Sequence, residues 1–153
     1  MSGEPARPEP TGVVLVDRTG DIGLAVSTSI GSDVQERSIE VRLFWQPNDP
    51  LSVRIEVDAR PDHPALPRGR WIVLRDFLRY GITVPTGDGD VRVTPDSGTG
   101  LVYLDLARPR RACRVALPVS LLDSFLAETE RRVPLGAERS DDMVEAFIEK
   151  LLR

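Results

Sequence analysis

Apolar and polar residues alternate up to residue 117, which is the pattern of strands half-buried in a sheet. Successive side chains of a strand point to opposite faces, so an apolar residue at every second position marks a buried face. Ile22, Leu24 and Val26 begin the first such run. The alternation predicts strands over residues 22–30, 39–45, 51–57, 70–74, 90–94, 101–106 and 111–117. The Pro- and Asx-rich turn 46–50 joins the second and third strands into a β-hairpin.

Residues 1–20 are poor in apolar positions and contain Pro5, Pro8 and Pro10. A segment of this composition gains too little from burial to offset the entropy lost on ordering, so we predict a flexible tail. Within the tail, residues 13–16 are four consecutive apolar residues. They are interpreted as an added edge strand, with a short partner-binding motif as the alternative, because extended segments can augment a sheet edge.

Three helices are predicted from caps and helical spacing. Asp76 as N-cap and Gly81 as a left-handed residue after the end frame a short helix. A helix of about 15 residues starts at Pro118, and a last helix starts at Ser140 as N-cap. The apolar face of the first of these two helices holds Leu122, Phe125, Leu126, Thr129 and Val133, and that of the last holds Val144, Phe147, Ile148 and Leu151.

These elements predict an α+β fold of about seven mostly antiparallel strands, forming a curved sheet or open barrel with helices on one face or end. A chain of 153 residues is long enough for one domain with its own core. The single cysteine allows no disulfide within the chain. No apolar stretch approaches the ~20 residues of a membrane span and no leader pattern opens the chain, so we expect a cytoplasmic protein.

The net charge of −4 argues against a dedicated nucleic-acid binder, since such modules usually carry net positive charge. Positive charge nevertheless gathers around the last hairpin, at Arg108, Arg110, Arg111 and Arg114. A solvated face or a charged sheet edge is the first interpretation. A protein interface and a single-stranded nucleic-acid face are the alternatives. No aromatic residue is interleaved in this segment, whereas single-strand binders place aromatic platforms beside the charge.

We predict no catalytic, cofactor or metal site. His63 is the only histidine and has no partner set for a triad or a zinc site, so it is interpreted as an exposed loop residue. Cys113 lies on a predicted strand and is interpreted as an inert core thiol. Asp88 and Asp90 flank Gly89 in a tight turn that lacks the remaining ligands of a calcium loop. Trp45 is interpreted, like Trp71, as a core aromatic.

Residues 71–95 resemble the signature of the SsgA-like family of actinobacterial regulators of sporulation-linked cell division. That signature reads approximately W-x-(hydrophobic)-x-R-(D/E)-L-L-x-x-G-L-x-x-P-x-G-x-G-D-V-x-V-x-P. Here it is matched from Trp71 through Arg75 and Gly81 to Pro95. The resemblance extends over roughly residues 21–153, which we interpret as one SsgA-like domain after the tail.

The resemblance implies a non-enzymatic protein at septum sites. It would be a scaffold that recruits, positions or promotes assembly of the tubulin-like division GTPase, aided by a membrane-associated relative. The family fold is a bell-shaped homotrimer whose subunit is similar to Whirly-type single-stranded nucleic-acid binders, and no cofactor is implied. Arg75 and Arg79 are interpreted as a basic spot on the short helix. We expect them to bind the partner together with Asp88 and Asp90. The alternative function is single-stranded nucleic-acid binding through the arginines of the last hairpin.

Overall fold

The computed structural model describes residues 10–30, 37–58, 69–109, 111–137 and 141–152. Antiparallel strands in this part of the chain form two sheets, with the orders β1-β2-β3-β4-β5 and β6-β7-β8-β9. The predicted α+β class is confirmed, and both sheets are open. The elements are β1 (Thr11–Val16), β2 (Ile22–Ile30), β3 (Arg37–Gln46), β4 (Asp49–Asp58), β5 (Gly69–Leu74), α1 (Arg75–Gly81), β6 (Thr86–Asp88), β7 (Val91–Asp96), β8 (Leu101–Arg108), β9 (Arg111–Pro118), α2 (Val119–Arg132) and α3 (Asp141–Leu151).

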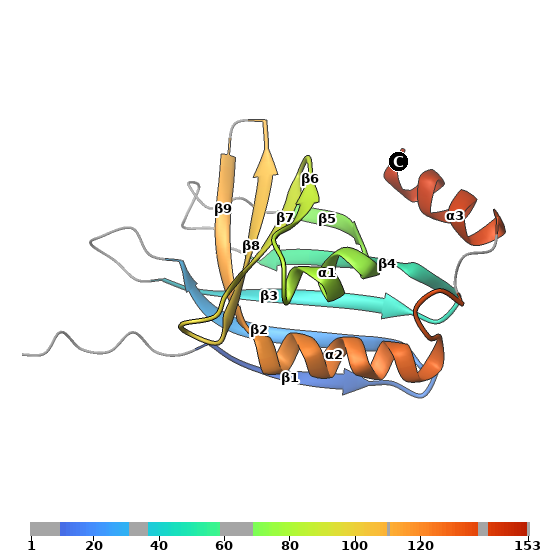
Figure 1. Ribbon diagram of the computed structural model, residues 1–153, viewed down its shortest axis with the longest axis horizontal. Helices are drawn as coiled ribbons and strands as arrows, with labels where there is room; N and C mark the ends of the chain where they lie inside the picture. The colour runs from blue at the N-terminus through green and yellow to red at the C-terminus, as the bar shows by residue number, and fades with distance from the viewer. Residues whose placement is uncertain (1–9, 31–36, 59–68, 110, 138–140, 153) are drawn as a thin grey trace, which may run out of the picture.

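The two sheets and two of the helices enclose the core (Figure 1). The strands β8 and β9 run across those of the first sheet, and β9 packs against β2. Helix α2 lies along β1 and β2, while α1 packs against β4, β5, β6 and β7. Helix α3 stands apart from α2 and contacts β4. One side of the five-stranded sheet is therefore covered by the rest of the fold.

The alternating apolar positions become the core, as predicted. Trp45 and Trp71 are both buried, and each indole finds a hydrogen-bond acceptor. Trp45 Nε1 donates to the Pro50 carbonyl over 3.0 Å, and Trp71 Nε1 donates to the Ala107 carbonyl over 3.0 Å, which links the two sheets. Other core residues are Ile22, Leu24, Val26, Val41, Leu43, Val53, Ile55, Val93, Val102, Leu104, Leu106, Val115, Leu117, Leu122, Phe125 and Leu126.

The interpretation of residues 13–16 as an edge strand is confirmed. Strand β1 pairs antiparallel with β2, from Thr11 opposite Ser27 to Val16 opposite Ile22. The prediction of a flexible tail is therefore wrong for residues 11–16, and residues 1–9 lie outside the described residues. Gly12 allows β1 to lie this close to β2, since a Cβ there would lie 2.6 Å from the Ala25 carbonyl oxygen. The apolar run outweighed the proline-rich composition because pairing satisfies its backbone groups.

Helix α1 has different ends from those predicted. Its N-cap is Leu74, with no capping side chain, so the N-cap role of Asp76 is wrong and this residue lies in the first turn. There its negative charge faces the positive end of the helix dipole. Gly81 is the last helical residue and has no left-handed conformation, which corrects the second prediction. A Cβ on Gly81 would lie 2.3 Å from Val93 Cγ1, so glycine allows α1 to approach β7.

The remaining elements largely follow the predictions. Helix α2 starts directly after Pro118, and the predicted face is buried up to Thr129. The predicted N-cap Ser140 lies outside the described residues, as does His63. The tight turn is confirmed at Gly89, whose φ is +73°, and it joins β7 to the short strand β6, which was not predicted. This strand is too short to carry a pattern of alternation.

Candidate functional site

Arg75 lies in the core and not at the surface. Its side chain is fully buried, and Nη1 donates to the Thr129 hydroxyl over 3.3 Å. The guanidinium carbon lies 5.5 Å from the centroid of the Trp45 ring, a cation–π distance. Arg75 thus connects α1 with α2 and β3. The prediction that it presents a basic spot is wrong, because a partner cannot reach it in the folded chain.

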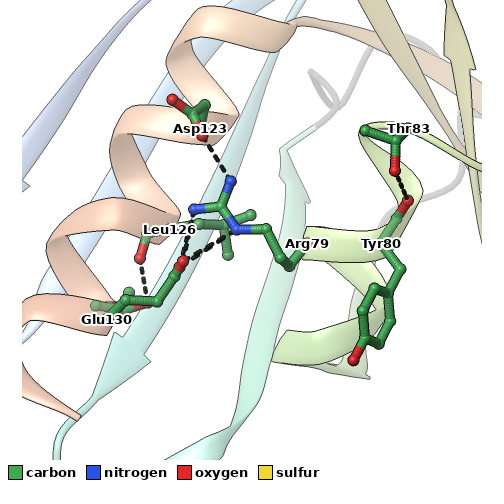
Figure 2. A network of polar contacts seen from close by, with 7 residues as sticks. Arg79, Tyr80, Thr83, Asp123, Leu126 and Glu130 are labelled. Atoms are coloured by element: carbon green, nitrogen blue, oxygen red, sulfur yellow. Dashed lines mark hydrogen bonds and ion pairs between the residues drawn. The ribbon is translucent and has the colours of Figure 1, made fainter. Parts of the chain in front are cut away.

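Arg79 connects α1 to α2 by ion pairs (Figure 2). Its Nη2 donates to the Glu130 carboxylate over 2.7 Å and its Nη1 donates to Asp123 over 2.5 Å. Desolvation by burial lowers the pKa of Arg79, but the hydrogen bonds to these two carboxylates outweigh it, so the pKa is raised. The Arg79 charge is therefore compensated within the chain. Tyr80 points away from α2 and is exposed.

The two predicted acidic residues flank the turn between β6 and β7. Asp90 is exposed, and its carbonyl accepts a hydrogen bond from the Ala107 backbone N–H over 2.8 Å. The backbone of Asp88 pairs opposite Val91, and its side chain lies outside the described part of the structure. Asp90 also lines an apolar groove beside α3. The structure therefore places this residue at the edge of a candidate interface.

The arginines of the last hairpin are spread over several contacts. The guanidinium of Arg108 lies 4.5 Å above the Trp71 ring and also donates to the Arg70 carbonyl. Arg110 and the side chain of Arg111 lie outside the described residues. Arg108, at the end of β8, therefore covers a core tryptophan and connects the two sheets through its contacts with β5. This is a structural role.

Arg114 lies on the solvent-facing side of the four-stranded sheet. Its Nε donates to Asp105 over 2.7 Å, and this hydrogen bond raises the pKa of Arg114. Tyr103, on the neighbouring strand, has its ring centroid 5.2 Å from the guanidinium. Sequence reasoning missed this aromatic because it belongs to another strand. Tyr103 favours the nucleic-acid alternative and the Asp105 pair disfavours it, so that alternative stays a prediction.

Of two common kinds of reactive group, a metal-ligating cluster and a free thiol, the described residues hold only the Cys113 thiol. Their His, Cys, Asp and Glu side chains include no group of three that could hold a metal ion. None of the described helices has the length and apolar character needed to cross a membrane. Burial raises the pKa of the Cys113 thiol to about 11, and the charge of Asp105 adds to the effect. The thiol is therefore protonated and unreactive at neutral pH.

Alkylation of Cys113 by iodoacetamide is expected to be slow in the folded protein. The shift from 9.0 to about 11 lowers the thiolate fraction at pH 8 by about 100-fold, and only the thiolate reacts. Rates measured by mass spectrometry in buffer and in concentrated urea should differ accordingly, and the native rate should rise tenfold per pH unit up to about pH 10. Equal rates in the two solvents would contradict the protected thiol.

Helix α3 carries an apolar stripe that the described part of the chain leaves open. Val144, Ile148 and Leu151 are between 41% and 53% exposed, and Leu152 is 82% exposed. Lys150 attaches the helix to β4 through an ion pair with Asp49, and Phe147, the remaining residue of the predicted stripe, is half-buried. The sequence pattern predicted the stripe but carried no signal that it stays uncovered, because amphipathicity does not say which surface covers a helix.

A groove of about 350 Å³ runs between α3 and the first turn of α1. Its lining is mostly apolar and comes from β5, α1, β7 and α3, namely Ile72, Val73, Leu74, Phe77, Asp90, Val91, Phe147 and Leu151. The groove and the stripe together form a continuous feature, since Leu151 belongs to both. We call it the α3 surface. Contiguous exposed apolar patches mark contacts with proteins or membranes or grooves for ligands, and the α3 surface is a candidate for such a contact.

The comparisons with known proteins agree with the resemblance of residues 71–95. The family described as "Streptomyces sporulation and cell division protein, SsgA" matches residues 39–138. A sporulation-specific cell division protein of Frankia casuarinae is 34% identical, covering 68% of this chain and 70% of the relative. SsgB of Streptomyces coelicolor is 41% identical over 70 residues, or 44% of this chain. That match spans 51%, about half, of the Streptomyces protein.

The solved structures that resemble this chain belong to proteins of the same kind. An SsgB structure, solved in connection with mutations that correlate to longitudinal cell division during sporulation of Streptomyces coelicolor, has a TM-score of 0.64 and 28% identity, and covers 76% of this chain and 92% of that one. The SsgA-like sporulation-specific cell division protein of Thermobifida fusca has a TM-score of 0.66 and 25% identity, with 90% and 98% covered. The sequence and the fold together lead to one conclusion: this chain belongs to the SsgA family of sporulation and cell division proteins.

Proposed function

We propose that this protein is a non-enzymatic scaffold that recruits or positions the tubulin-like division GTPase at septum sites during sporulation. The observation that carries the proposal is the membership of a family whose SsgB mutations correlate to longitudinal division, which is a change in the plane of division. A protein that places the septum would, when altered, produce such a change. This supports a positional role for the present chain.

The α3 surface is the contact that we assign to this scaffold. Ile148 and Leu151 are each about half exposed, so covering them contributes roughly 1 kcal/mol per side chain. Asp90 at the groove and the exposed Glu145 on the helix provide a polar rim around the apolar centre. Such a contact is weak alone. It suits a protein that associates reversibly with a polymer.

A homotrimer, as the family resemblance implies, would make this weak contact effective. Three copies of the α3 surface in one assembly can bind neighbouring subunits of one filament, and the second and third contacts then form at a high effective concentration. A membrane-associated relative would hold the assembly at the septum. The scaffold itself then needs neither a cofactor nor a membrane span.

Co-sedimentation with the division GTPase of the same organism, with and without GTP, tests this function. We expect the protein in the polymer pellet only with GTP. Ile148→Glu should reduce the recovered fraction at least about fivefold, because it places a charge in the apolar stripe, a loss of at least roughly 1 kcal/mol. Val84→Glu is the matched control, since Val84 is a comparably exposed apolar residue on the loop after α1.

The possible outcomes distinguish a failure of the proposed function from a failure of the α3 surface as the contact. A folded wild-type protein that stays in the supernatant would overturn direct recruitment of the polymer. Recovery of Ile148→Glu at the wild-type level would leave recruitment standing and remove the α3 surface as the contact. Circular dichroism of each variant confirms that the comparison is between folded proteins.

A further inference from the structure

Strand β1 is an edge strand without the usual protection. Edge strands are normally very short or carry charges or prolines, because their unpaired backbone groups would otherwise bind other strands. The opposite edge of the same sheet, β5, carries Arg70, and in the second sheet β6 has three residues while β9 packs against β2. Strand β1 has six residues, Thr-Gly-Val-Val-Leu-Val, with no charge and no proline.

Strand β1 carries apolar side chains on both faces of the sheet, on the face that packs against the core and on the opposite, solvent-exposed face. Val13, Leu15 and Val16 are 48% to 57% exposed, while Val14 packs against the core. Alternation therefore puts Val13 and Leu15 on the sheet face turned away from α2. Among the described strands only β2 pairs with β1, and β1 forms the lower edge of the molecule in Figure 1. Within the part of the chain that the structure describes, a row of backbone groups and a row of apolar side chains on β1 are therefore both left without a partner strand.

We propose that β1 pairs antiparallel with β1 of a second copy of this chain, about a two-fold axis at Val14. Apart from water, the partner that satisfies a whole row of backbone groups at an open edge is another extended strand. The strand itself meets every requirement for that partner, because it is extended, apolar and uncharged. Two-fold pairing of identical surfaces is also the commonest symmetry of homo-oligomers.

The register follows from the two faces of the sheet. Residues directly opposite each other in a ladder lie on the same face, so an outward-facing residue must oppose another outward-facing residue. With Val14 opposite Val14 of the second copy, Val13 opposes Leu15 and Gly12 opposes Val16. Moving the axis to Val13 would leave Val16 outside the ladder and pair Thr11 with Leu15. The axis at Val14 therefore covers all three exposed apolar residues.

This contact differs from the proposed trimer, because a two-fold contact cannot by itself generate three-fold symmetry. It joins the five-stranded sheets of two copies into one continuous sheet. The two-fold contact can therefore link assemblies whatever their internal number of copies. An assay for it must report the register of β1 and not merely the mass of the oligomer.

Cysteine cross-linking in a Cys113→Ser background reports that register. Directly opposite residues have Cβ atoms about 4.5–5.5 Å apart and diagonal ones about 7–8 Å, and a disulfide needs close Cβ atoms. Under mild oxidation, Val14→Cys should cross-link to itself. Val13→Cys mixed with isotope-labelled Leu15→Cys should cross-link at least about tenfold faster than either variant alone, given that difference in separation.

A lysine at the edge tests the same contact by repulsion. Leu15→Lys, made in the Val14→Cys chain, should abolish its cross-linking because two lysines would approach across the axis. Val84→Lys removes an equally exposed apolar residue elsewhere and should leave the rate unchanged. If Val14→Cys fails to cross-link, or if Val13→Cys alone reacts as fast as the mixture, the proposed pairing is overturned.

Discussion

Replacement of Arg75 by alanine is expected to lower the free energy of unfolding by about 3–5 kcal/mol. The arginine side chain is fully buried, so truncation leaves a cavity among α1, α2 and β3. The Thr129 hydroxyl also loses a donor, and the Trp45 ring loses the guanidinium above it. Urea unfolding followed by tryptophan fluorescence would measure the change directly, since both tryptophans lie in the core.

Arg75→Met is the informative comparison. Methionine refills most of the volume without a charge, and replacing buried ionic groups by apolar ones of similar size is often neutral. We therefore expect Arg75→Met to be more stable than Arg75→Ala by about 2 kcal/mol. An alanine variant within about 1 kcal/mol of wild type would contradict a packed role for this side chain. Charge reversal at Arg75 is expected to unfold the protein, so it cannot test partner binding.

Strand alternation contained the signal for the buried arginine. Trp71 and Val73 face the core from β5, and Arg75 is the next position of the same parity. The start of a helix hid this continuity, because a charged residue on a helix is normally assigned to solvent. Thr129 gave a second signal as a hydroxyl on the apolar face of α2. A polar residue on each of two apolar faces indicates that they meet.

Periodicity predicted the elements more reliably than their surroundings. Most of the strands and both C-terminal helices could be predicted from the spacing of apolar residues, which depends only on residues close in sequence. What covers Val13 and Leu15, or the stripe of α3, depends on other elements and on other molecules, so no local pattern contains it. The aromatic beside Arg114 was missed for the same reason, because Tyr103 reaches it across the β8–β9 ladder.

Gly81→Ala tests a different kind of non-local constraint. Helix propensity alone would make alanine more stable than glycine by about 1 kcal/mol within α1. The new methyl group would lie 2.3 Å from Val93 Cγ1 and 2.5 Å from Val93 Cβ. The Cβ belongs to a fully buried strand residue and cannot rotate away, so α1 and β7 must separate. Overpacking of this kind costs about 1–3 kcal/mol, so after the gain in propensity we expect a net loss near 1 kcal/mol.

The double variant Gly81→Ala/Val93→Ala tests how much of the clash comes from the Val93 methyl groups and how much from the Val93 Cβ. Removing the Val93 methyl groups relieves the contact at 2.3 Å but keeps the Cβ contact at 2.5 Å, so we expect only partial recovery in a double-mutant cycle. Gly23→Ala is the control, since its Cβ would meet only the Leu43 carbonyl oxygen at 3.8 Å, and it should stay within about 0.5 kcal/mol of wild type. Stabilisation by Gly81→Ala would mean that propensity governs this position. Destabilisation with partial recovery would establish that the glycine of the family signature is there for the contact between α1 and β7.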